Sequence, residues 1–408
     1  MKVVVTNTRV SNTGDAAILL GLERGLRHPA EEVELSVHDD DPPTAARRLG
    51  REVHPQLQAV VASSPMRRRT ARVALRAPAL VKQRLLGWEA HSLAERYARA
   101  DVVISTGGTY LSDWYDPAPR LRELCLAHDL GRPLVLFTQS IGPIWRRSTR
   151  RALRRLSRSA ALIMVREESS RAQLARLGVE SRTVTCADAA FALADPDTLR
   201  RARRPREGRR QARVAISVRA WAHFEHADPD QAMTRYLGAI AALTDHLVRS
   251  RGARVTFVST CQGDPAYGHD DSVIAYLLTA RLPLTTLGSV EVDGRARDPA
   301  ALMGLLGSFD VVVATRLHAG ILALAAGTPA LFVAYEGKTY GVAARLGIKD
   351  SVQPMEGISA WSLITAADSM LDHERELRPR LFARVERERL EALDAGRMVR
   401  EALRTANG

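Results

Sequence analysis

Arg316 and His318 are the residues whose types and spacing most clearly predict chemistry. They follow an apolar stretch that begins at Val311 and precede a run of small apolar residues, so we expect them where a β-strand ends and a helix begins. Open α/β sheets bind ligands at such strand ends, and the free amide groups at a helix start attract anions. Histidine exchanges protons near neutral pH, and arginine presents a planar fork to carboxylate or phosphate. The pair therefore predicts chemistry on a small phosphorylated or carboxylated anion, unless Arg316 merely pairs with an acid and His318 caps the helix.

Three further cations are expected at strand ends. Lys338 is one of only four lysines, and it follows the next predicted strand in a glycine-containing loop that returns to the same end of the sheet. Arg219 ends the first strand of the second half of the chain, and Arg166 occupies the equivalent strand end in the first half. Fixed cations of this kind bind phosphate and carboxylate groups. The alternatives are a solvated surface lysine and, for each arginine, an ordinary position in an arginine-rich chain.

Two loops after strands of the first half could hold sugar hydroxyls. One is N-T-G-D, with Asn12 and Asp15, and the other is G-G-T-Y-L-S-D, with Gly107, Gly108 and Asp113. Glycine lets the backbone approach a ligand closely, and amide or carboxylate groups bind hydroxyls. A helix cap and a turn explain the same residues without a ligand. Neither loop matches the glycine patterns of dinucleotide or nucleoside-triphosphate sites.

The elements that position these residues alternate between strand and helix along the whole chain. This alternation predicts an α/β fold with two Rossmann-like parallel-sheet domains whose strand ends face each other across a cleft. The expected segments are an N-terminal α/β domain, a basic linker, a C-terminal α/β domain and charged C-terminal helices that pack back on the first domain: 1–195, 196–213, 214–365 and 366–408.

Composition narrows the class of protein. The chain has 408 residues, 46% hydrophobic content and a formal net charge of +13, which favours an anionic partner. Zinc-finger spacings and aromatic stacking platforms are missing, so a nucleic-acid partner is not expected. Three widely spaced cysteines and the lack of a long apolar run favour a cytoplasmic protein. The basic segment Met66–His91 is interpreted as a solvated helical arm or, alternatively, as a contact with anionic lipid or a lipid-pyrophosphate acceptor at the inner face of the membrane.

An ordered set of motifs resembles the polysaccharide pyruvyl transferase family. These are N-T-G-D-A-A-I-L, S-T-G-G-T-Y-L-S-D, T-Q-S-I-G-P, V-R-E-E-S-S, S-V-R-A-W and T-R-L-H-A-G followed by the Lys338 loop, over roughly residues 1–350. The family is similar in fold to GT-B glycosyltransferases. Its members move the carboxyethylidene group of phosphoenolpyruvate onto two hydroxyls of one sugar, and they release phosphate. The resemblance implies His318 as the catalytic histidine, with Arg316, Arg219, Arg166 and Lys338 around the donor. It also implies that the acceptor lies on the side of the domain 1–195 and the phosphoenolpyruvate donor on the side of the domain 214–365.

The resemblance leaves the acceptor open between a glycan of the cell envelope, a lipid-linked precursor and a glycosylated metabolite. Phosphoenolpyruvate is expected as co-substrate, with no cofactor and no metal, because the cations already neutralise charge and no carboxylate cluster for Mg²⁺ is evident. The rival enzyme on this fold is a nucleotide-sugar glycosyltransferase. This alternative is less favoured because many retaining glycosyltransferases of this fold carry a glutamate pair in the donor domain. Here the position eight after Glu336, which would complete such a pair, is Ala344. A basic protein that binds nucleic acid or a membrane surface is the non-enzymatic alternative.

Overall fold

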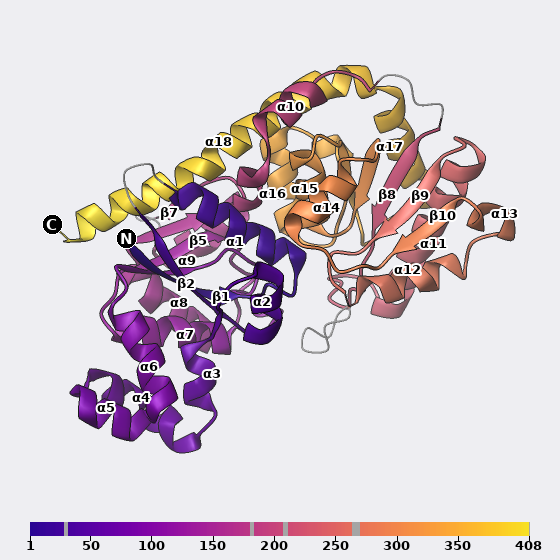
Figure 1. Cartoon of the computed structure of the whole chain (residues 1–408). Helices are drawn as coiled ribbons and strands as arrows, with labels where there is room; N and C mark the ends of the chain where they lie inside the picture. Colours follow the sequence, from indigo (N-terminus) through magenta and orange to yellow (C-terminus); the bar gives the residue numbers. More distant parts are fainter. Residues whose placement is uncertain (28–31, 180–182, 207–210, 263–269, 408) are drawn as a thin grey trace. The chain divides into compact units, whose positions relative to one another are not determined.

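The computed structural model describes residues 1–27, 32–179, 183–206, 211–262 and 270–407 (Figure 1). The chain divides into two compact units, and each contains more than one stretch of sequence. Unit 1 consists of Met1–Val10, Ile18–Ala189 and Glu391–Gly408, and unit 2 consists of Ser11–Ala17 and Ala190–Leu390. The two units therefore differ from the predicted division at residue 195, because short segments at both ends of the chain belong to the other unit.

Unit 1 is built on a seven-stranded parallel sheet with the order β3-β2-β1-β4-β5-β6-β7. Its strands are β1 (Lys2–Thr8), β2 (Glu34–Asp39), β3 (His54–Pro55), β4 (Val102–Ser105), β5 (Leu134–Gln139), β6 (Leu162–Val165) and β7 (Thr183–Thr185). Its helices are α2 (Pro42–Leu49), α3 (Leu57–Ala62), α4 (Pro65–Arg76), α5 (Ala79–Leu86), α6 (Trp88–Ala98), α7 (Ala118–Asp129), α8 (Arg147–Ser159) and α9 (Glu168–Arg176). Strand order reverses between β1 and β4, so their carboxyl ends form the switch point of this sheet.

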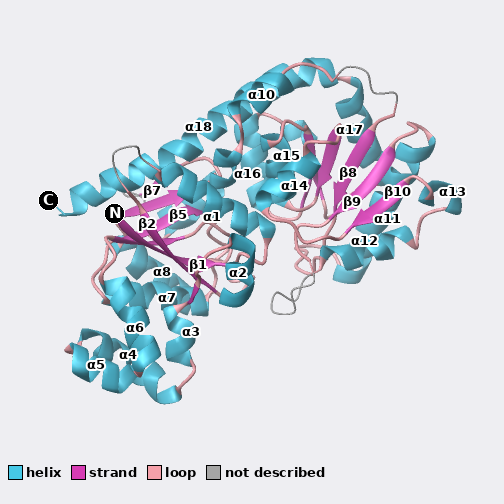
Figure 2. Cartoon of the chain, in the orientation of Figure 1, coloured by secondary structure: helices cyan, strands magenta, loops and turns pink. Residues whose placement is uncertain are grey.

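Unit 2 is built on a six-stranded parallel sheet with the order β10-β9-β8-β11-β12-β13 (Figure 2). Its strands are β8 (Arg213–Ser217), β9 (Arg254–Val258), β10 (Val290–Asp293), β11 (Val311–Ala314), β12 (Ala330–Ala334) and β13 (Val352–Pro354). Its helices are α10 (Pro196–Ala202), α11 (Pro229–Arg249), α12 (Asp271–Thr279), α13 (Leu284–Leu287), α14 (Pro299–Leu306), α15 (Leu317–Ala325), α16 (Gly337–Leu346) and α17 (Ala360–Asp372). The switch point lies between β8 and β11. Two helices, α1 (Thr13–Leu26) and α18 (Glu374–Asn407), belong partly to each unit.

Local sequence explains why these elements form. The central strands β4, β5, β11 and β12 are buried along their whole length, as expected for parallel strands covered on both faces. Three helices of unit 2 begin with an Asp-Pro pair, in which the aspartate caps free amides and proline fits the first helical position. The capping carboxylates accept hydrogen bonds from the amides of Thr198, Gln231 and Ala301.

The structure agrees with several predicted elements and corrects others. The predicted alternation of strands and helices is observed, and Arg166 directly follows a strand, β6, as expected. The segment 196–213, predicted as a linker, instead begins with helix α10, and its residues 207–210 lie outside the described part of the chain. Lys338 was expected in a loop, but it lies in the first turn of α16. At the end of the chain, the second half of α18 packs in unit 1, where Arg400 donates a hydrogen bond to the Leu26 carbonyl.

Candidate functional site

The switch point of the unit 2 sheet carries the residues that sequence favoured for chemistry. β8 and β11 pair in parallel, so Ser217 and Ala314 are neighbours at their carboxyl ends. The next residue but one, Arg316, donates a backbone hydrogen bond to Ser217 Oγ at 3.1 Å and precedes the first residue of α15. This placement at the start of a helix confirms the position predicted for Arg316 and His318. It also places them where open α/β sheets bind ligands.

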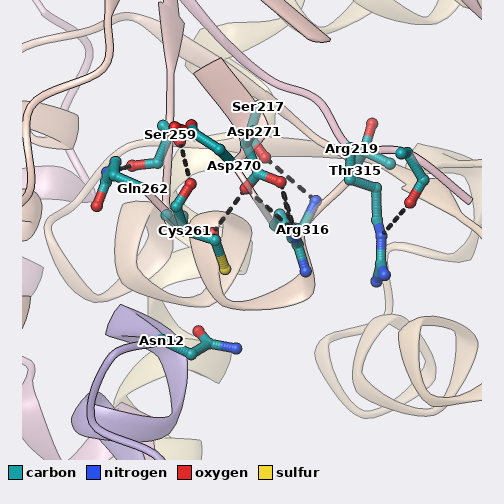
Figure 3. Close-up of polar contacts among 12 residues, drawn as sticks. Asn12, Ser217, Arg219, Ser259, Cys261, Gln262, Asp270, Asp271, Thr315 and Arg316 are labelled. Atoms are coloured by element: carbon teal, nitrogen blue, oxygen red, sulfur yellow. Dashed lines mark hydrogen bonds and ion pairs between the residues drawn. The ribbon is translucent and has the colours of Figure 1, made fainter. Parts of the chain in front are cut away.

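Arg316 is fixed by a two-pronged ion pair with Asp271, as Figure 3 shows. Its Nε lies 3.1 and 3.0 Å from the two carboxylate oxygens, and both side chains are buried. Asp271 is the first residue of α12, where the helix amino end also favours a negative charge. Removing one member of such a pair leaves an uncompensated buried charge. Asp271 therefore fixes the orientation of the guanidinium, and the alternative that Arg316 pairs with an acid is realised.

His318 lies in the first turn of α15 and is half-buried. Gly14 of the N-T-G-D loop packs against its imidazole, because a Cβ added at Gly14 would lie 2.6 Å from His318 Nδ1. The same loop is joined to unit 2 by a hydrogen bond from the Thr13 amide to the Thr260 carbonyl at 3.2 Å. The loop was expected in the first domain, beside an acceptor. In the structure it belongs to the unit that contains His318.

Asn12 and Asp15 share that location (Figure 3 labels Asn12). Asn12 Oδ1 accepts a hydrogen bond from the Gly14 amide at 2.9 Å, which forms the tight turn that precedes α1. Asp15 lies in the first turn of that helix, a favourable place for an acid. The structural alternative for this loop therefore holds, and the loop also gives the imidazole a glycine surface to pack against.

A cluster of cations and aromatic rings lies at the neighbouring strand ends. Arg219 follows β8, and its guanidinium carbon lies 4.2 Å from the Tyr335 ring centre and 4.8 Å from that of Trp221. Lys338 Nζ lies 5.3 Å from the same Tyr335 ring and forms an ion pair with Glu336, which follows β12. The aromatic faces attract both cations. Arg219 and Lys338 therefore converge on one ring, as the prediction of a common location required.

Tyr236 connects this cluster to Arg316. Its hydroxyl lies 2.8 Å from Thr315 Oγ1, and it is close enough to Arg219 and Asp271 for their charges to affect its pKa. Burial is the main cause, and it raises the pKa of Tyr236 well above its usual range. The phenol therefore remains a protonated structural link. Arg316, Arg219 and Lys338 are thus parts of one site in unit 2.

The fourth predicted donor-binding cation, Arg166, lies in unit 1 and has different surroundings. It is only 1% exposed, and it forms an ion pair with Asp188 and donates a hydrogen bond to Ser140 Oγ at 2.8 Å. A second carboxylate, that of Glu167, lies 3.7 Å away. These contacts within unit 1 hold the guanidinium in place. The other three cations belong to unit 2, and a donor-binding role for Arg166 stays a prediction.

The remaining predicted acceptor residues also serve the fold of unit 1. Asp113 is buried and accepts hydrogen bonds from the Trp145 and Arg146 amides at 2.6 and 2.7 Å, just before helix α8. A side chain at Gly107 would collide with Thr138, and one at Gly108 would collide with Tyr110. These glycines are therefore explained by close packing within the chain.

Sequence reasoning missed two acids of the site in unit 2. Asp271 lies 45 residues before Arg316, and no local sequence pattern predicts that they pair. Glu336 was noticed only as part of the Lys338 segment, although a glutamate next to a predicted site lysine is a recognisable signal. Within the described residues, no group of three or more His, Cys, Asp or Glu side chains could hold a metal ion.

Comparison with known proteins identifies the family. Residues 12–337 match the family described as polysaccharide pyruvyl transferase, and the chain belongs to that family. It is 24% identical to the amylovoran biosynthesis protein AmsJ of Erwinia amylovora, over 96% of this chain and 97% of that protein. The chain is therefore a member of a transferase family, and it is similar to a protein of amylovoran biosynthesis.

Solved structures define the fold as GT-B-like. A putative UDP-N-acetylglucosamine 2-epimerase from Listeria monocytogenes matches with a TM-score of 0.60 at 13% identity, over 99% of this chain and 96% of that one. Anabaena HepE, solved in complex with UDP, matches with a TM-score of 0.59 at 14% identity, over 99% and 100%. These identities show a shared architecture of two parallel-sheet units, in agreement with the predicted fold class.

Proposed function

We propose that this protein transfers the carboxyethylidene group of phosphoenolpyruvate onto two hydroxyls of one sugar in a glycan, a lipid-linked glycan precursor or a glycosylated metabolite. The observation that supports this proposal is the placement of Arg316 and His318 at the β8–β11 switch point, with Arg219 and Lys338 at adjoining strand ends. Family membership supports the reaction class.

The cations suit a donor that carries a phosphate and a carboxylate. Arg219 and Lys338 both lie close to the Tyr335 ring, and Asp271 holds Arg316 in place. A guanidinium fixed in advance loses little freedom when it binds an anion. In this proposal Arg316, Arg219 and Lys338 bind the donor, and Asp271 and Glu336 position two of them.

The chemistry requires two proton transfers. A sugar hydroxyl adds to C2 of phosphoenolpyruvate, its proton is lost, and the methylene carbon gains a proton to become a methyl group. The carbon–oxygen bond to phosphate then breaks, and the second hydroxyl adds to C2 and gives up its proton, which balances the release of hydrogen phosphate. His318 carries one of the two transfers, and positioned cations stabilise the departing phosphate. No resident metal or cofactor is part of this proposal.

Thermal stability with candidate donors tests the proposal. A ligand present at 100 times its dissociation constant stabilises the folded state by about 2.7 kcal/mol, which raises the melting temperature by a few degrees. We expect phosphoenolpyruvate to do so and UDP-N-acetylglucosamine not to. Stabilisation by the sugar nucleotide alone would replace pyruvyl transfer with glycosyl transfer. Phosphate release from phosphoenolpyruvate over a panel of glycans with neighbouring free hydroxyls would then identify the acceptor.

A further inference from the structure

Helices α4, α5 and α6 of unit 1 expose an unusual concentration of large apolar side chains. Five of the 13 such side chains among the described residues lie in one short segment of 23 residues. They are Met66, Val73, Leu80, Val81 and Trp88. Leu80 is 83% exposed and Trp88 is 73% exposed. Clustered exposure of this kind marks a contact surface, whereas scattered apolar residues do not.

The segment already has a separate apolar face that packs inside unit 1. Ala71, Ala74 and Leu75 of α4 and Leu86 of α5 are buried in the hydrophobic core of the unit. The exposed apolar residues are therefore not needed to hold these helices in place. Core packing therefore does not explain why this second set of apolar side chains is present.

Exposed arginines alternate with these exposed apolar residues along the sequence. In α4, Met66, Arg69, Val73 and Arg76 follow one another at spacings of three and four residues, which places them on one side of a helix. In α5, the exposed Arg84 lies four residues after Leu80. We call these six residues, with Val81 and Trp88, the basic apolar surface.

Basic residues predominate around this surface, although the exposed Glu89 directly follows Trp88. Residues 65–87 contain seven basic residues and no acidic residue. Of these, Lys82 is buried and paired with Glu95 at 3.2 Å, so it serves the fold. Arg76 reaches Asp129 Oδ1 at 3.1 Å, and Arg155 of α8 reaches the same oxygen at 3.2 Å. The arginines of α4 therefore adjoin those of α8, a helix whose sequence between residues 144 and 165 also lacks acids.

We propose that the basic apolar surface docks on an anionic lipid bilayer, with Leu80 and Trp88 in the interface and the arginines at the headgroups. Amphipathic helices that combine arginine with Trp and Leu lie in the plane of such interfaces, and long basic side chains extend along apolar surface toward the headgroups. The surface is not suited to pairing with a second copy, because a two-fold contact would bring like charges together. Figure 1 shows α4 and α5 grouped beyond α6 within unit 1, away from its sheet. None of the described helices is long and apolar enough to cross a membrane.

Vesicle sedimentation of the full chain tests the proposal without a donor or acceptor. The probes are phosphatidylcholine vesicles with and without phosphatidylglycerol. We expect binding to the anionic vesicles, at least about tenfold weaker in Leu80→Ser/Trp88→Ser, because each buried apolar side chain contributes strongly to transfer. The matched control is Leu284→Ser/Trp361→Ser in unit 2, where the side chains are 88% and 76% exposed. The control should bind like the wild type.

A charge variant and a fold measurement complete the experiment. Arg69→Glu/Arg84→Glu should lose at least about tenfold in binding to anionic vesicles. Phosphoenolpyruvate-induced stabilisation should persist in both surface variants, which separates failure of this inference from failure of the proposed reaction. Equal binding by wild type and Leu80→Ser/Trp88→Ser would overturn the inference. So would a surface that binds RNA, an acidic protein or a second copy while vesicles remain unbound.

Discussion

The switch points of the two sheets both carry polar residues, but these residues have different roles. In unit 1, Asn7 Nδ2 donates to Ser105 Oγ at 3.1 Å, and Gln139 Nε2 donates to the Tyr110 hydroxyl at 2.7 Å, so side chains tie neighbouring strand ends together. In unit 2, Arg316 and His318 occupy the corresponding edge, and the histidine is half-buried. A switch point therefore does not create a site by itself, because in unit 1 the side chains at this position form hydrogen bonds with one another.

The surroundings of one arginine in each unit, Arg166 and Arg316, can be compared in the same way. Arg166 and Arg316 both follow strands and both pair with an aspartate, Asp188 and Asp271. Arg166 is 1% exposed and has a second carboxylate nearby, whereas Arg316 is 8% exposed. Both pairs are buried, so what separates the two arginines is the second carboxylate beside Arg166 and the position of Arg316 at the start of α15, two residues before His318.

The largest expected effect distinguishes the histidines of the two units. His318→Ala should lower turnover by about 10²–10⁴-fold, because it removes a positioned proton-transfer group. The melting temperature should change little, because the side chain is only half-buried, and the stabilisation by phosphoenolpyruvate should persist, because the proposed donor-binding cations remain. Phosphate release at saturating donor measures the change. His128→Ala, a half-buried histidine in α7 of unit 1, is the control, and equal turnover in the two variants would exclude His318 from catalysis.

The second-largest effect is expected from disturbing the contact between Gly14 and His318. Gly14→Ala should displace the imidazole and lower kcat by up to about 10²-fold, because misplacement of a catalytic group by about 1 Å has that cost. In a His318→Ala background the same substitution should change nothing further. Gly238→Ala in α11, where an added Cβ meets no atom within 4 Å, is the matched control. Additive losses in the double variant would show that Gly14 acts independently of the imidazole.

Matched lysine substitutions test the two arginines. Arg316→Lys should weaken phosphoenolpyruvate binding by about tenfold, because it keeps the charge but loses the planar fork. Arg166→Lys should lower the free energy of unfolding by about 1–3 kcal/mol and leave donor affinity unchanged, because its lost hydrogen bonds are internal. Denaturant unfolding and donor titration measure both quantities for each variant. A loss of donor affinity in Arg166→Lys would instead show that Arg166 takes part in donor binding.

The smallest effect concerns His38, the sealed histidine of unit 1. Burial is the main cause that lowers the pKa of His38 to about 3. The unfolded chain binds a proton as the pH falls below 6.5 while the folded chain does not, so stability is present at neutral pH and is lost between about pH 6.5 and 3. From pH 7 to pH 5 this loss amounts to about 2 kcal/mol.

His38→Asn should reduce that pH dependence without affecting donor binding at neutral pH. Denaturant unfolding at pH 7 and pH 5 gives the difference for the wild type and the variant. An identical pH dependence in the two proteins would show that His38 becomes protonated in the folded state.

The sequence predicted what local patterns control. Buried strands such as β5 and β6 are runs of apolar residues, and Arg316 and His318 follow such a run directly, so their place at a strand end could be predicted. Position along the chain, in contrast, does not tell with which unit a segment packs. The N-T-G-D loop follows the first strand, yet the Thr13 amide bonds to the Thr260 carbonyl of unit 2.

Long-range pairings set the limit of prediction at the site. Asp271 begins the helix that follows β9, and Arg316 directly precedes the helix that follows β11, so only the folded sheet brings the two residues together. Arg166 looked like Arg316 in sequence because both follow a strand. Its enclosure by Asp188 and Ser140 depends on tertiary packing, which the strand pattern does not encode.

Helix α18 has a consequence for synthesis of the chain. Unit 2 ends at Leu390, but unit 1 also needs Glu391–Gly408, and Gly396 approaches Gly25 so closely that no side chain fits between them. The ribosome therefore synthesises all of unit 2 before it synthesises the last helical segment of unit 1. We expect a nascent chain to hold an incomplete first unit throughout translation of the second, so that the unit made first is the one completed last.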